Sequence, residues 1–308
     1  MPTTTKKAKP KEGSHRGSAQ SSANRLNVQK TYKLFIGGKF PRTESGRYYT
    51  LKSAEGEQLG NICRASRKDF RESVLAARAA FKGWSAKSAF NRSQILYRLA
   101  EMLEGRQAQF IDELTMQGST KVAAQKEVIA AVDRLVYYAG WCDKYQQIFS
   151  AVNPVASSHF NFSVLEPTGV VVIVAPEENS LIGLVTTAAS AIAGGNTSII
   201  LASESKPLCA VSFAEVINTS DVPGGVINIL TGKLSELIGH FTTHMDVNSI
   251  VYCGDDRAMI KKIKSDSTSN LKRPVFRTAI NWLSAEAETP YFISDMQETK
   301  TTWHPIGI

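Results

Sequence analysis

The second half of the sequence alternates between short β-branched runs and longer stretches with helical periodicity. From residue 162 the expected strands are FSVLEP, GVVVIVAP, TSIILA, GVINILTG, SIVYCG and PVFRTA, and the expected helices are LIGLVTTAASAIAGG, LCAVSFAEVINTS, LSELIGHFTTH and residues 256–264. Continuous β-branched runs are typical of strands that are buried on both faces. A helix after each strand makes neighbouring strands parallel, with right-handed crossovers. The pattern therefore predicts an α/β fold, a Rossmann-like, doubly wound parallel sheet.

The first half has a different organisation. KLFIGGKF (33–40) predicts a short hairpin around Gly37-Gly38, and YYTLKS and LGNICRAS predict further short strands. Apolar residues then recur at helical spacing in 67–84, 91–118 and 122–149. We expect this N-terminal helical region to pack on the sheet, with a β element that protrudes. Residues 283–308 lose the alternation, and their end, TTWHPIGI, is a candidate last strand.

The positive charge of the chain is concentrated at its start. The formal net charge is +8, and residues 1–30 contain seven lysines and arginines but one acid, so most of the excess belongs to this polar segment. We interpret residues 1–31 as a basic, disordered tail, 32–282 as one lobe and 283–308 as an extension. A nearly neutral lobe makes nucleic acid an improbable partner, although the tail could contact an acidic partner electrostatically.

The composition gives no sign of membrane insertion or secretion. No run of 18 apolar residues occurs, and the first 30 residues have no apolar signal-peptide core. The basic, Ser-rich start leaves a transit peptide as an alternative, but it has almost no apolar face. Four scattered cysteines without a CxxC pair favour a reducing compartment and argue against a disulfide framework or a zinc site. We expect a cytoplasmic protein.

Two strand-to-helix turns carry pairs of acids. Glu177-Glu178 precedes the apolar helix after IVAP, and Asp255-Asp256 follows SIVYCG. Such turns are favoured phosphate sites in α/β folds. Carboxylates there can cap the helix and occupy the place of a diphosphate. Two negative charges about 4–6 Å from a phosphate oppose its binding by about 3 kcal/mol or more. We therefore expect helix capping rather than nucleotide binding, while recognition of a cationic ligand stays open.

Three further patterns have simple structural interpretations. His240 and His244 lie on one helix face, as in zinc motifs, but neither an intervening Glu nor a third ligand accompanies them. Thr231-Gly232-Lys233 lacks the upstream glycine of a phosphate loop and is interpreted as a turn that ends a strand. Cys253 precedes a helix start, but the following acids oppose thiolate formation, so we expect a buried cysteine.

Six ordered segments resemble the first half of the aldehyde dehydrogenase superfamily. They are LFIGGKF, AARAAFKGWS, VLEPTGVVVIVAP, AIAGGNTSIIL, VPGGVINILTG and HMDVNSIVYCG, and the similarity spans roughly residues 32–276. The end, SNLKRPVF…TKTTWHPIGI, is similar to the degenerate C-terminal module of the family-sixteen aldehyde dehydrogenases. The resemblance implies a nicotinamide-binding lobe and a β element used in dimerisation.

The resemblance also locates departures at the catalytic positions. The Asn that holds the oxyanion in the family falls on Glu178, whose charge would repel an oxyanion. The general-base Glu falls on Arg277, and the sequence ends where the domain with the nucleophilic Cys would begin. We therefore expect no catalytic residue, with Glu178 and Arg277 as degenerate positions and no metal.

The cofactor positions are altered as well. The Lys that binds the adenosine ribose in the family falls on Leu201, while the neighbouring Glu is kept as Glu204. The turn near the pyrophosphate falls on Cys253-Gly254-Asp255, and Glu177 lies in the altered Pro-Trp-Asn segment. With Gly232, we treat these as vestigial positions (Glu177, Leu201, Glu204, Gly232, Gly254 and Asp255) and expect no cofactor.

The sequence thus predicts a catalytically degenerate aldehyde dehydrogenase-like module, a pseudoenzyme that acts in assembly. The resemblance implies pairing through the hairpin near 33–40, the strand near 158–166 and the C-terminal strand. The expected partner is a second copy or a full-length aldehyde dehydrogenase. The alternative is an NAD(P)-dependent subunit that oxidises an aldehyde to a carboxylic acid with a nucleophile supplied by a partner chain. A third option is a module whose acidic turns bind a cationic ligand.

Overall fold

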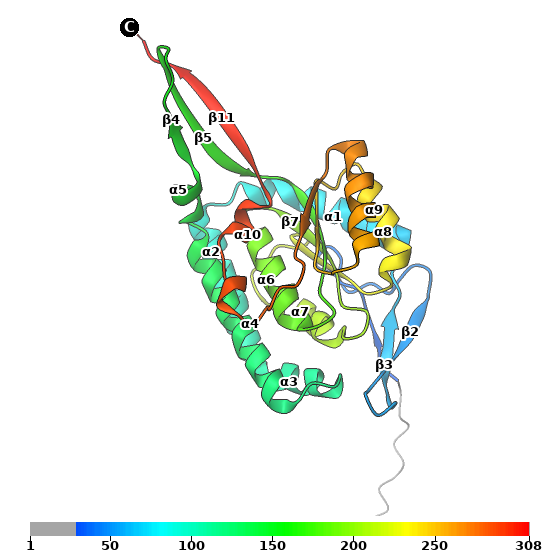
Figure 1. The fold of residues 1–308 in the computed structure, drawn as a ribbon. Coiled ribbons are helices and arrows are strands. Elements are labelled where there is room, and N and C mark those ends of the chain that lie inside the picture. Colours follow the sequence, from blue (N-terminus) through cyan, green and yellow to red (C-terminus); the bar gives the residue numbers. More distant parts are fainter. Residues whose placement is uncertain (1–28, 308) are drawn as a thin grey trace, which may run out of the picture.

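The computed structural model describes residues 29–307 (Figure 1). The basic tail predicted for residues 1–31 therefore lies outside the described residues, except for its last three. No helix in the described part is both long and apolar enough to cross a membrane.

A five-stranded parallel sheet forms the centre of the molecule. Its strands are β6 (Val170–Val174), β7 (Thr197–Leu201), β8 (Ile227–Leu230), β9 (Ser249–Tyr252) and β10 (Arg273–Phe276), in the order β10-β9-β6-β7-β8. The chain winds outward from β6 to β8 and then returns to place β9 on the other side of β6. The strand order reverses between β6 and β9, so the predicted doubly wound sheet is confirmed.

Helices cover both faces of this sheet. They are α6 (Ser180–Ala193), α7 (Leu208–Thr219), α8 (Leu234–Thr243) and α9 (Arg257–Ser267). Side chains of β6 alternate between the faces: Val171 and Ile173 pack with α6 and α7, whereas Val170, Val172 and Val174 pack with α8 and α9. This alternation is the two-residue period of a strand. Burial on both faces explains why β6 has no polar residue.

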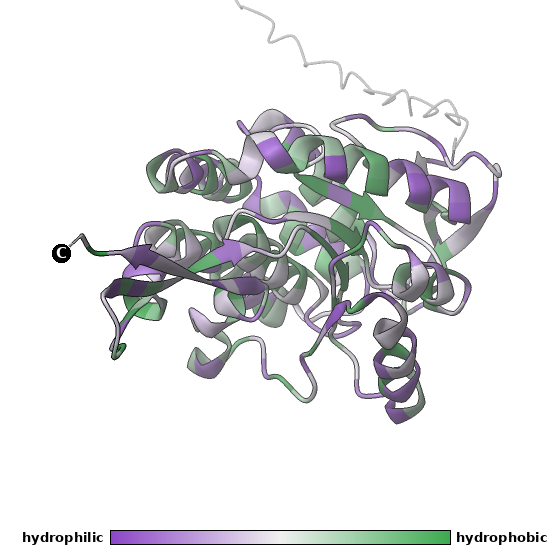
Figure 2. Ribbon diagram, turned by 90° about the horizontal axis from the view of Figure 1, so that it is seen from above, coloured by the Kyte–Doolittle hydropathy of each residue, from purple (hydrophilic) through white to green (hydrophobic). Residues whose placement is uncertain are grey.

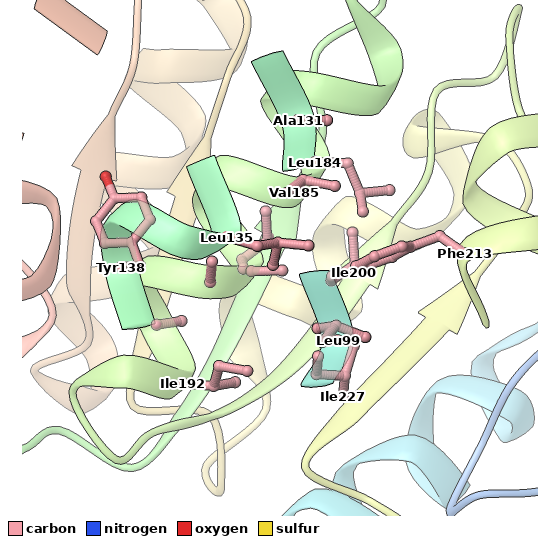
Figure 3. Close-up of a cluster of buried hydrophobic side chains, with 14 of the residues drawn as sticks. Leu99, Ala131, Leu135, Tyr138, Leu184, Val185, Ile192, Ile200, Phe213 and Ile227 are labelled. Carbon is pink, nitrogen blue, oxygen red and sulfur yellow. The ribbon is translucent and has the colours of Figure 1, made fainter. Parts of the chain in front are cut away.

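The N-terminal helices extend both layers. They are α1 (Arg67–Ser85), α2 (Ala89–Glu104), α3 (Gln107–Met116), α4 (Lys121–Trp141) and the short α5 (Tyr145–Phe149). Ser66, Ser88 and Thr120 cap α1, α2 and α4 through their hydroxyl groups. Figure 3 shows Leu99 of α2 and Leu135 of α4 directed toward Ile200 of β7. The expectation that the helical region packs on the sheet is confirmed.

Helix α6 is the innermost helix of the fold. All 14 of its residues are buried; most are apolar, and the hydroxyls of Thr186, Thr187 and Ser190 donate to carbonyls of the helix itself. It packs on α4 and α2, and the C-terminal segment with η2 (Ala285–Ala287) and α10 (Tyr291–Ser294) lies against it as well. A helix that is apolar all round is stable only when it is enclosed in this way.

A second sheet protrudes from the lobe (Figures 1 and 2). It is antiparallel and consists of β4 (Ala151–Asn153), β5 (His159–Pro167) and β11 (Gln297–Pro305), in the order β11-β5-β4. β11 pairs with β5 along its whole length, from Gln297 opposite Pro167 to Pro305 opposite His159. The C-terminal strand is thus present, is longer than predicted, and belongs to the protruding element.

The predicted hairpin of residues 33–40 forms, but it does not protrude. Ile36 pairs with Lys39 across the Gly37-Gly38 turn, and both glycines have positive φ angles. Phe35 exchanges two backbone hydrogen bonds with Ile229 of β8, of 2.9 and 2.8 Å. Phe35 thus already pairs with β8, and the role of this hairpin in pairing with another chain stays a prediction.

A small sheet lies beside this hairpin. It contains β1 (Thr31–Tyr32), β2 (Tyr48–Lys52) and β3 (Gln58–Cys63), in the order β1-β3-β2. Its β2 and β3 strands correspond to the short strands predicted from YYTLKS and LGNICRAS. A single turn of 3-10 helix, η1 (Thr268–Asn270), connects α9 to β10.

Candidate functional site

The carboxyl ends of β6, β9 and β10 enclose a cavity of about 410 Å³. It lies at the point where the strand order reverses, which is where doubly wound sheets bind their ligands. The structure brings both predicted acidic turns and Arg277 to this one cavity. Its lining residues come from three loops: Pro176, Glu177, Glu178, Asn179, Tyr252, Cys253, Gly254, Asp255, Asp256, Arg277, Ala279, Ile280 and Trp282.

The Glu177 carboxylate is held by the loop that follows β7. The backbone N–H groups of Glu204 and Ser205 donate to it at 2.9 and 3.1 Å. The hydroxyls of Ser203 and Ser205 donate at 2.7 and 2.6 Å. Burial opposes ionisation of Glu177, but these hydrogen bonds outweigh it and lower the pKa of the carboxyl below its usual value. Four donors of the chain therefore converge on one carboxylate, although Glu177 itself is exposed, and we call this arrangement the Glu177 nest.

The prediction that the Glu177-Glu178 pair caps helix α6 is wrong. Glu178 points to solvent, with its side chain 81% exposed, and forms an ion pair with Lys206 at 2.6 Å. Asn179 occupies the N-cap position in a left-handed conformation and makes no side-chain cap. The α6 N–H groups of Leu181 and Ile182 donate instead to Oε1 of Glu127, at 2.9 and 3.3 Å.

Glu127 is a site residue that the sequence analysis missed. It belongs to α4, 54 residues before Leu181, and is 5% exposed. Burial raises the pKa of its carboxyl, and the two N–H donors oppose that shift. Glu127 occupies one position of the apolar stripe of α4. A Glu at a position where an apolar residue is expected could have marked it in the sequence as a buried carboxylate with a specific partner.

The second acidic turn behaves as predicted for one of its two residues. Asp256 is the N-cap of α9 and accepts hydrogen bonds from the N–H groups of Ala258 and Met259, at 2.8 and 3.3 Å. Asp255 instead accepts from the backbone N–H of Ala279, at 2.8 Å, and so ties the loop after β10 to the loop after β9. The prediction of helix capping is confirmed for Asp256 and is wrong for Asp255.

Arg277 is immobilised inside the cavity wall. Its guanidinium forms an ion pair with Asp295 at 2.7 Å and lies 4.0 Å from the centroid of the Phe292 ring. Its side chain is only 9% exposed. A guanidinium is a hydrogen-bond donor with no acceptor atom, so Arg277 does not offer the chemistry of a general base.

Of the remaining vestigial positions, Gly254 lines the cavity, and Leu201, Glu204 and Gly232 do not. Leu201 is 2% exposed and packs in the core below the loop. The Glu204 side chain lies 3.6 Å from Lys233, across the turn that contains Gly232. A Cβ atom on Gly232 would lie 3.1 Å from the Ala65 backbone, and one on Gly254 would lie 2.5 Å from the Tyr252 hydroxyl. Both glycines therefore serve close packing of the chain on itself.

None of the four cysteines is placed as a nucleophile. All four are buried, and Cys253 alone lines the cavity. Burial raises the pKa of the Cys253 thiol to about 12, and the nearby Arg277 charge only partly opposes this. A thiol with such a pKa is protonated at neutral pH and unreactive, so the interpretation of Cys253 as a buried strand-end cysteine is confirmed.

The segment 277–296 closes the cavity on the side of α6. Arg134 of α4 donates to the carbonyls of Trp282 and Ala287, and the Tyr138 hydroxyl donates to the Thr289 carbonyl at 3.1 Å. The Trp282 ring lies so close to α6 that a Cβ on Gly183 would be 3.2 Å from it. This cover is not predictable from the sequence, because residues 283–296 carry no periodic pattern.

Among residues 29–307, no group of three or more His, Cys, Asp or Glu side chains is arranged to hold a metal ion. His240 lies in α8 and His244 is the residue that follows its last turn, and neither lines the cavity. The turn at Thr231 is tied to β3 by a 2.6 Å hydrogen bond from its hydroxyl to the Cys63 carbonyl.

Comparison with known proteins assigns this architecture to a family. The aldehyde dehydrogenase family model matches residues 40–279. Cytosolic 10-formyltetrahydrofolate dehydrogenase of Mus musculus is 32% identical over 260 residues, which is 82% of this chain and 29% of that protein. The putative aldehyde dehydrogenase DhaS of Bacillus subtilis is 32% identical over 251 residues, 80% of this chain and 50% of that protein.

Solved structures agree with the sequence comparison. PnpE from Pseudomonas sp. WBC-3 superposes with a TM-score of 0.76 and 28% identity, over 80% of this chain and 50% of that one. The G224D mutant of an aldehyde dehydrogenase from Bacillus cereus superposes with a TM-score of 0.76 and 25% identity, over 80% of this chain and 50% of that one. The chain thus spans about half the length, or less, of the relatives that it matches. It belongs to the aldehyde dehydrogenase family.

Proposed function

We propose that this chain is a catalytically degenerate aldehyde dehydrogenase module that acts in assembly, as a partner of itself or of a catalytic aldehyde dehydrogenase. The Glu177 nest is the observation that carries this proposal. A carboxylate of the chain itself takes the four hydrogen-bond donors at the carboxyl end of β7. A nucleotide at this place would have to displace an anion that is already well solvated by the protein.

The charges around the cavity support the same conclusion. Glu178, Asp255 and Asp256 line it together with Glu177, whereas Lys206 and Arg277 are already paired with carboxylates. A diphosphate placed about 5 Å from two carboxylates is repelled by about 3 kcal/mol or more at an effective dielectric constant near 20. That repulsion weakens binding by about two decades. The residues at the cofactor positions of the family do not fit a dinucleotide.

The described residues do not provide the groups that aldehyde oxidation needs, an oxyanion-holding amide and a general base. The resemblance places Glu178 at the position of the oxyanion-holding amide, and it places Arg277, which is paired with Asp295, at the position of the general base. The segment of residues 277–296 is fixed against α4 and α6 by Arg134, Tyr138 and the close approach of Trp282 to Gly183. Because neither catalytic group is in place, we favour a structural role over the alternative of an NAD(P)-dependent subunit completed by another chain.

The protruding sheet provides the means of assembly. β11 is an outer strand of this sheet and pairs only through its edge facing β5, so its other edge carries backbone groups that a strand of another chain can satisfy. Large apolar side chains are exposed here, with Val152 at 67%, Trp303 at 57% and Phe160 at 45%. A shallow hollow of about 330 Å³ lies between β4 and β5 and is lined by Val152, Phe160 and Phe162. Such a surface is typical of a protein–protein contact.

The proposal is tested by sedimentation velocity of the full chain and of two variants. We expect the chain to form a dimer or larger assembly, and Phe160→Glu combined with Val152→Glu to dissociate it. The control is Lys126→Glu with Lys261→Glu, two exposed lysines outside this sheet that should leave assembly unchanged. A full-length aldehyde dehydrogenase is then added. A chain that sediments as a monomer and binds no such enzyme contradicts the proposal.

A further inference from the structure

A cavity of about 340 Å³ lies between the first turns of α1 and the last turn of α8, distant from the acidic turns. It is lined by Arg67, Phe70, Arg71, His240, Thr243 and His244. The two histidines are the pair noted above for its i, i+4 spacing, and the fold sets two arginines opposite them rather than a third metal ligand. We call this cavity the α1–α8 site.

The side chains that line the α1–α8 site carry positive charge, and no acidic side chain among them balances it. No carboxylate lines it, and within residues 29–307 neither Arg67 nor Arg71 forms an ion pair. Both arginine side chains are exposed, whereas both histidines are half-buried. Uncompensated guanidinium groups that face a polar hollow favour an anion, and their planar forks match the oxygens of a phosphate.

Positive charge also lies behind the site. Lys272 is 4% exposed and donates its ammonium protons to the carbonyls of His244 and Val247, with no carboxylate partner. Arg78 donates to Asn248 at 2.7 Å and leaves its Nε–H without an acceptor. Burial lowers the pKa of the Lys272 ammonium to about 8, because no carboxylate offsets its desolvation. A bound anion at the α1–α8 site would therefore favour the charged form of Lys272.

His244 is held in a defined orientation at this site. The Asp246 backbone N–H donates to its Nδ1 at 3.2 Å, and this assigns the ring proton to Nε2, where it can be donated to a ligand. The Phe70 ring packs edge-on against the imidazole, with centroids 5.6 Å apart. The groups that face His244 are the Asp246 carboxylate and the cations Arg71, Arg78 and Lys272. Cations outnumber the acid three to one.

We propose that the α1–α8 site binds a phosphate dianion, either as inorganic phosphate or as the phosphate group of a small monoester. The volume lies at the lower end of the range for small-molecule sites, roughly 300–1,000 Å³, and admits a ligand of this size. A polyanion fits less well, because Glu44, Asp69 and Glu72 line the adjoining hollow and interrupt the basic surface. The site lies apart from the Glu177 nest, so it stands independently of the proposed function.

The test is an NMR titration of the histidine imidazoles in the full chain at constant pH. Sodium phosphate is added and compared with sodium chloride of equal ionic strength. We expect the His240 and His244 signals to shift saturably, with a dissociation constant of about 1 mM or tighter. His159 and His304 lie in the protruding sheet and provide internal reference signals that should not move. Glycerol 3-phosphate, with glycerol as its control, distinguishes a monoester from inorganic phosphate by its relative affinity.

Two variants decide whether the arginines form the site. Arg71→Gln should weaken phosphate binding about tenfold through loss of a charge-assisted contact. The matched control is Arg257→Gln, which removes the same charge from the first turn of α9, outside the residues that line the α1–α8 site. Equal effects of the two variants, or equal shifts of the His159, His240, His244 and His304 signals, or the same shifts with chloride, would each overturn the proposal.

Discussion

The two acidic turns have the same sequence pattern and different structural roles. Each consists of two acids between a buried strand and a helix, yet only the turn after β9 caps its own helix, through Asp256. After β6, Glu177 turns away from α6 to the loop that follows β7, and α6 receives its acceptor from Glu127 of α4. The helix after β9 is exposed and can be capped locally, whereas α6 is enclosed by other helices that supply the cap themselves.

This difference follows from burial. α9 has two buried residues, so water can reach its first turn and a local Asp is sufficient. All of α6 is buried, and its first N–H groups need a protein acceptor. The comparison predicts that stability depends strongly on the distant cap of α6 and weakly on the local acids of both turns.

Removing the distant cap should have the largest effect. Glu127→Ala leaves the N–H groups of Leu181 and Ile182 buried without an acceptor, and we expect a loss of about 2–4 kcal/mol in the free energy of unfolding. Glu127→Gln keeps a carbonyl acceptor and should lose less than half as much. Urea unfolding followed by circular dichroism measures both. A loss below about 0.5 kcal/mol for the alanine variant would show that α6 does not depend on this residue.

Emptying the Glu177 nest should have an intermediate effect. Glu177→Ala removes the acceptor of four hydrogen bonds, but the loop can be hydrated, so we expect a loss of about 1–2 kcal/mol by the same measurement. Glu177→Gln is the isosteric control. If the alanine variant is as stable as the parent chain, the nest contributes nothing that water does not replace.

The ionisation of Glu177 predicts a pH dependence. Its pKa in the folded chain is lower than the 4.5 that is usual for a glutamate, so its contribution to stability is complete above that value and is lost as pH falls through the folded pKa. The parent chain should therefore lose stability on acidification from about pH 5 to pH 3. In Glu177→Gln this part of the loss should be absent. Stability is measured by thermal unfolding at several pH values in this range. If the stability of the two chains falls equally steeply with pH, the assignment to Glu177 is contradicted.

The local cap of α9 should have a smaller effect. Asp256→Ala should cost about 1 kcal/mol, which is typical of an exposed N-cap. Asp256→Asn retains an acceptor and should cost a few tenths of that amount. Chemical denaturation of the three chains side by side gives the values. A loss as large as that of Glu127→Ala would remove the distinction between a local and a distant cap.

The exposed member of the first pair should have the smallest effect. Glu178 is 81% exposed in its pair with Lys206, so Glu178→Ala should change stability by less than about 0.5 kcal/mol. The matched variant is Glu166→Ala, which breaks another exposed pair, with Lys300. Thermal unfolding at low and at high salt measures the change in stability caused by each substitution. This change should be nearly the same for the two variants.

Much of the fold follows from local pattern. The runs VVVIV and TSIIL contain no polar side chain larger than Thr, so they are readable as central strands of a parallel sheet. The location of the site is also predictable, because a doubly wound topology brings the turns after β6 and β9 to one cavity. Each of these inferences needs only the order of elements along the chain.

The partners of individual side chains are not predictable in this way. Glu177 binds a loop 27 residues away, Glu127 caps a helix 54 residues away, and Arg134 reaches a carbonyl 153 residues away. The hairpin of 33–40 satisfies its edge on β8, at Ile229. These contacts depend on how the elements pack, and no periodic signal in the chain encodes them.

The central claim is that the chain fills its own nucleotide site, and direct titration with NAD⁺ tests it most simply. Isothermal calorimetry of the full chain with NAD⁺ up to about 1 mM should show only heats of dilution, because the Glu177 nest and the surrounding acids oppose a diphosphate. A saturable heat with a dissociation constant in the micromolar range would contradict the claim, and would favour the alternative of a subunit that retains its cofactor.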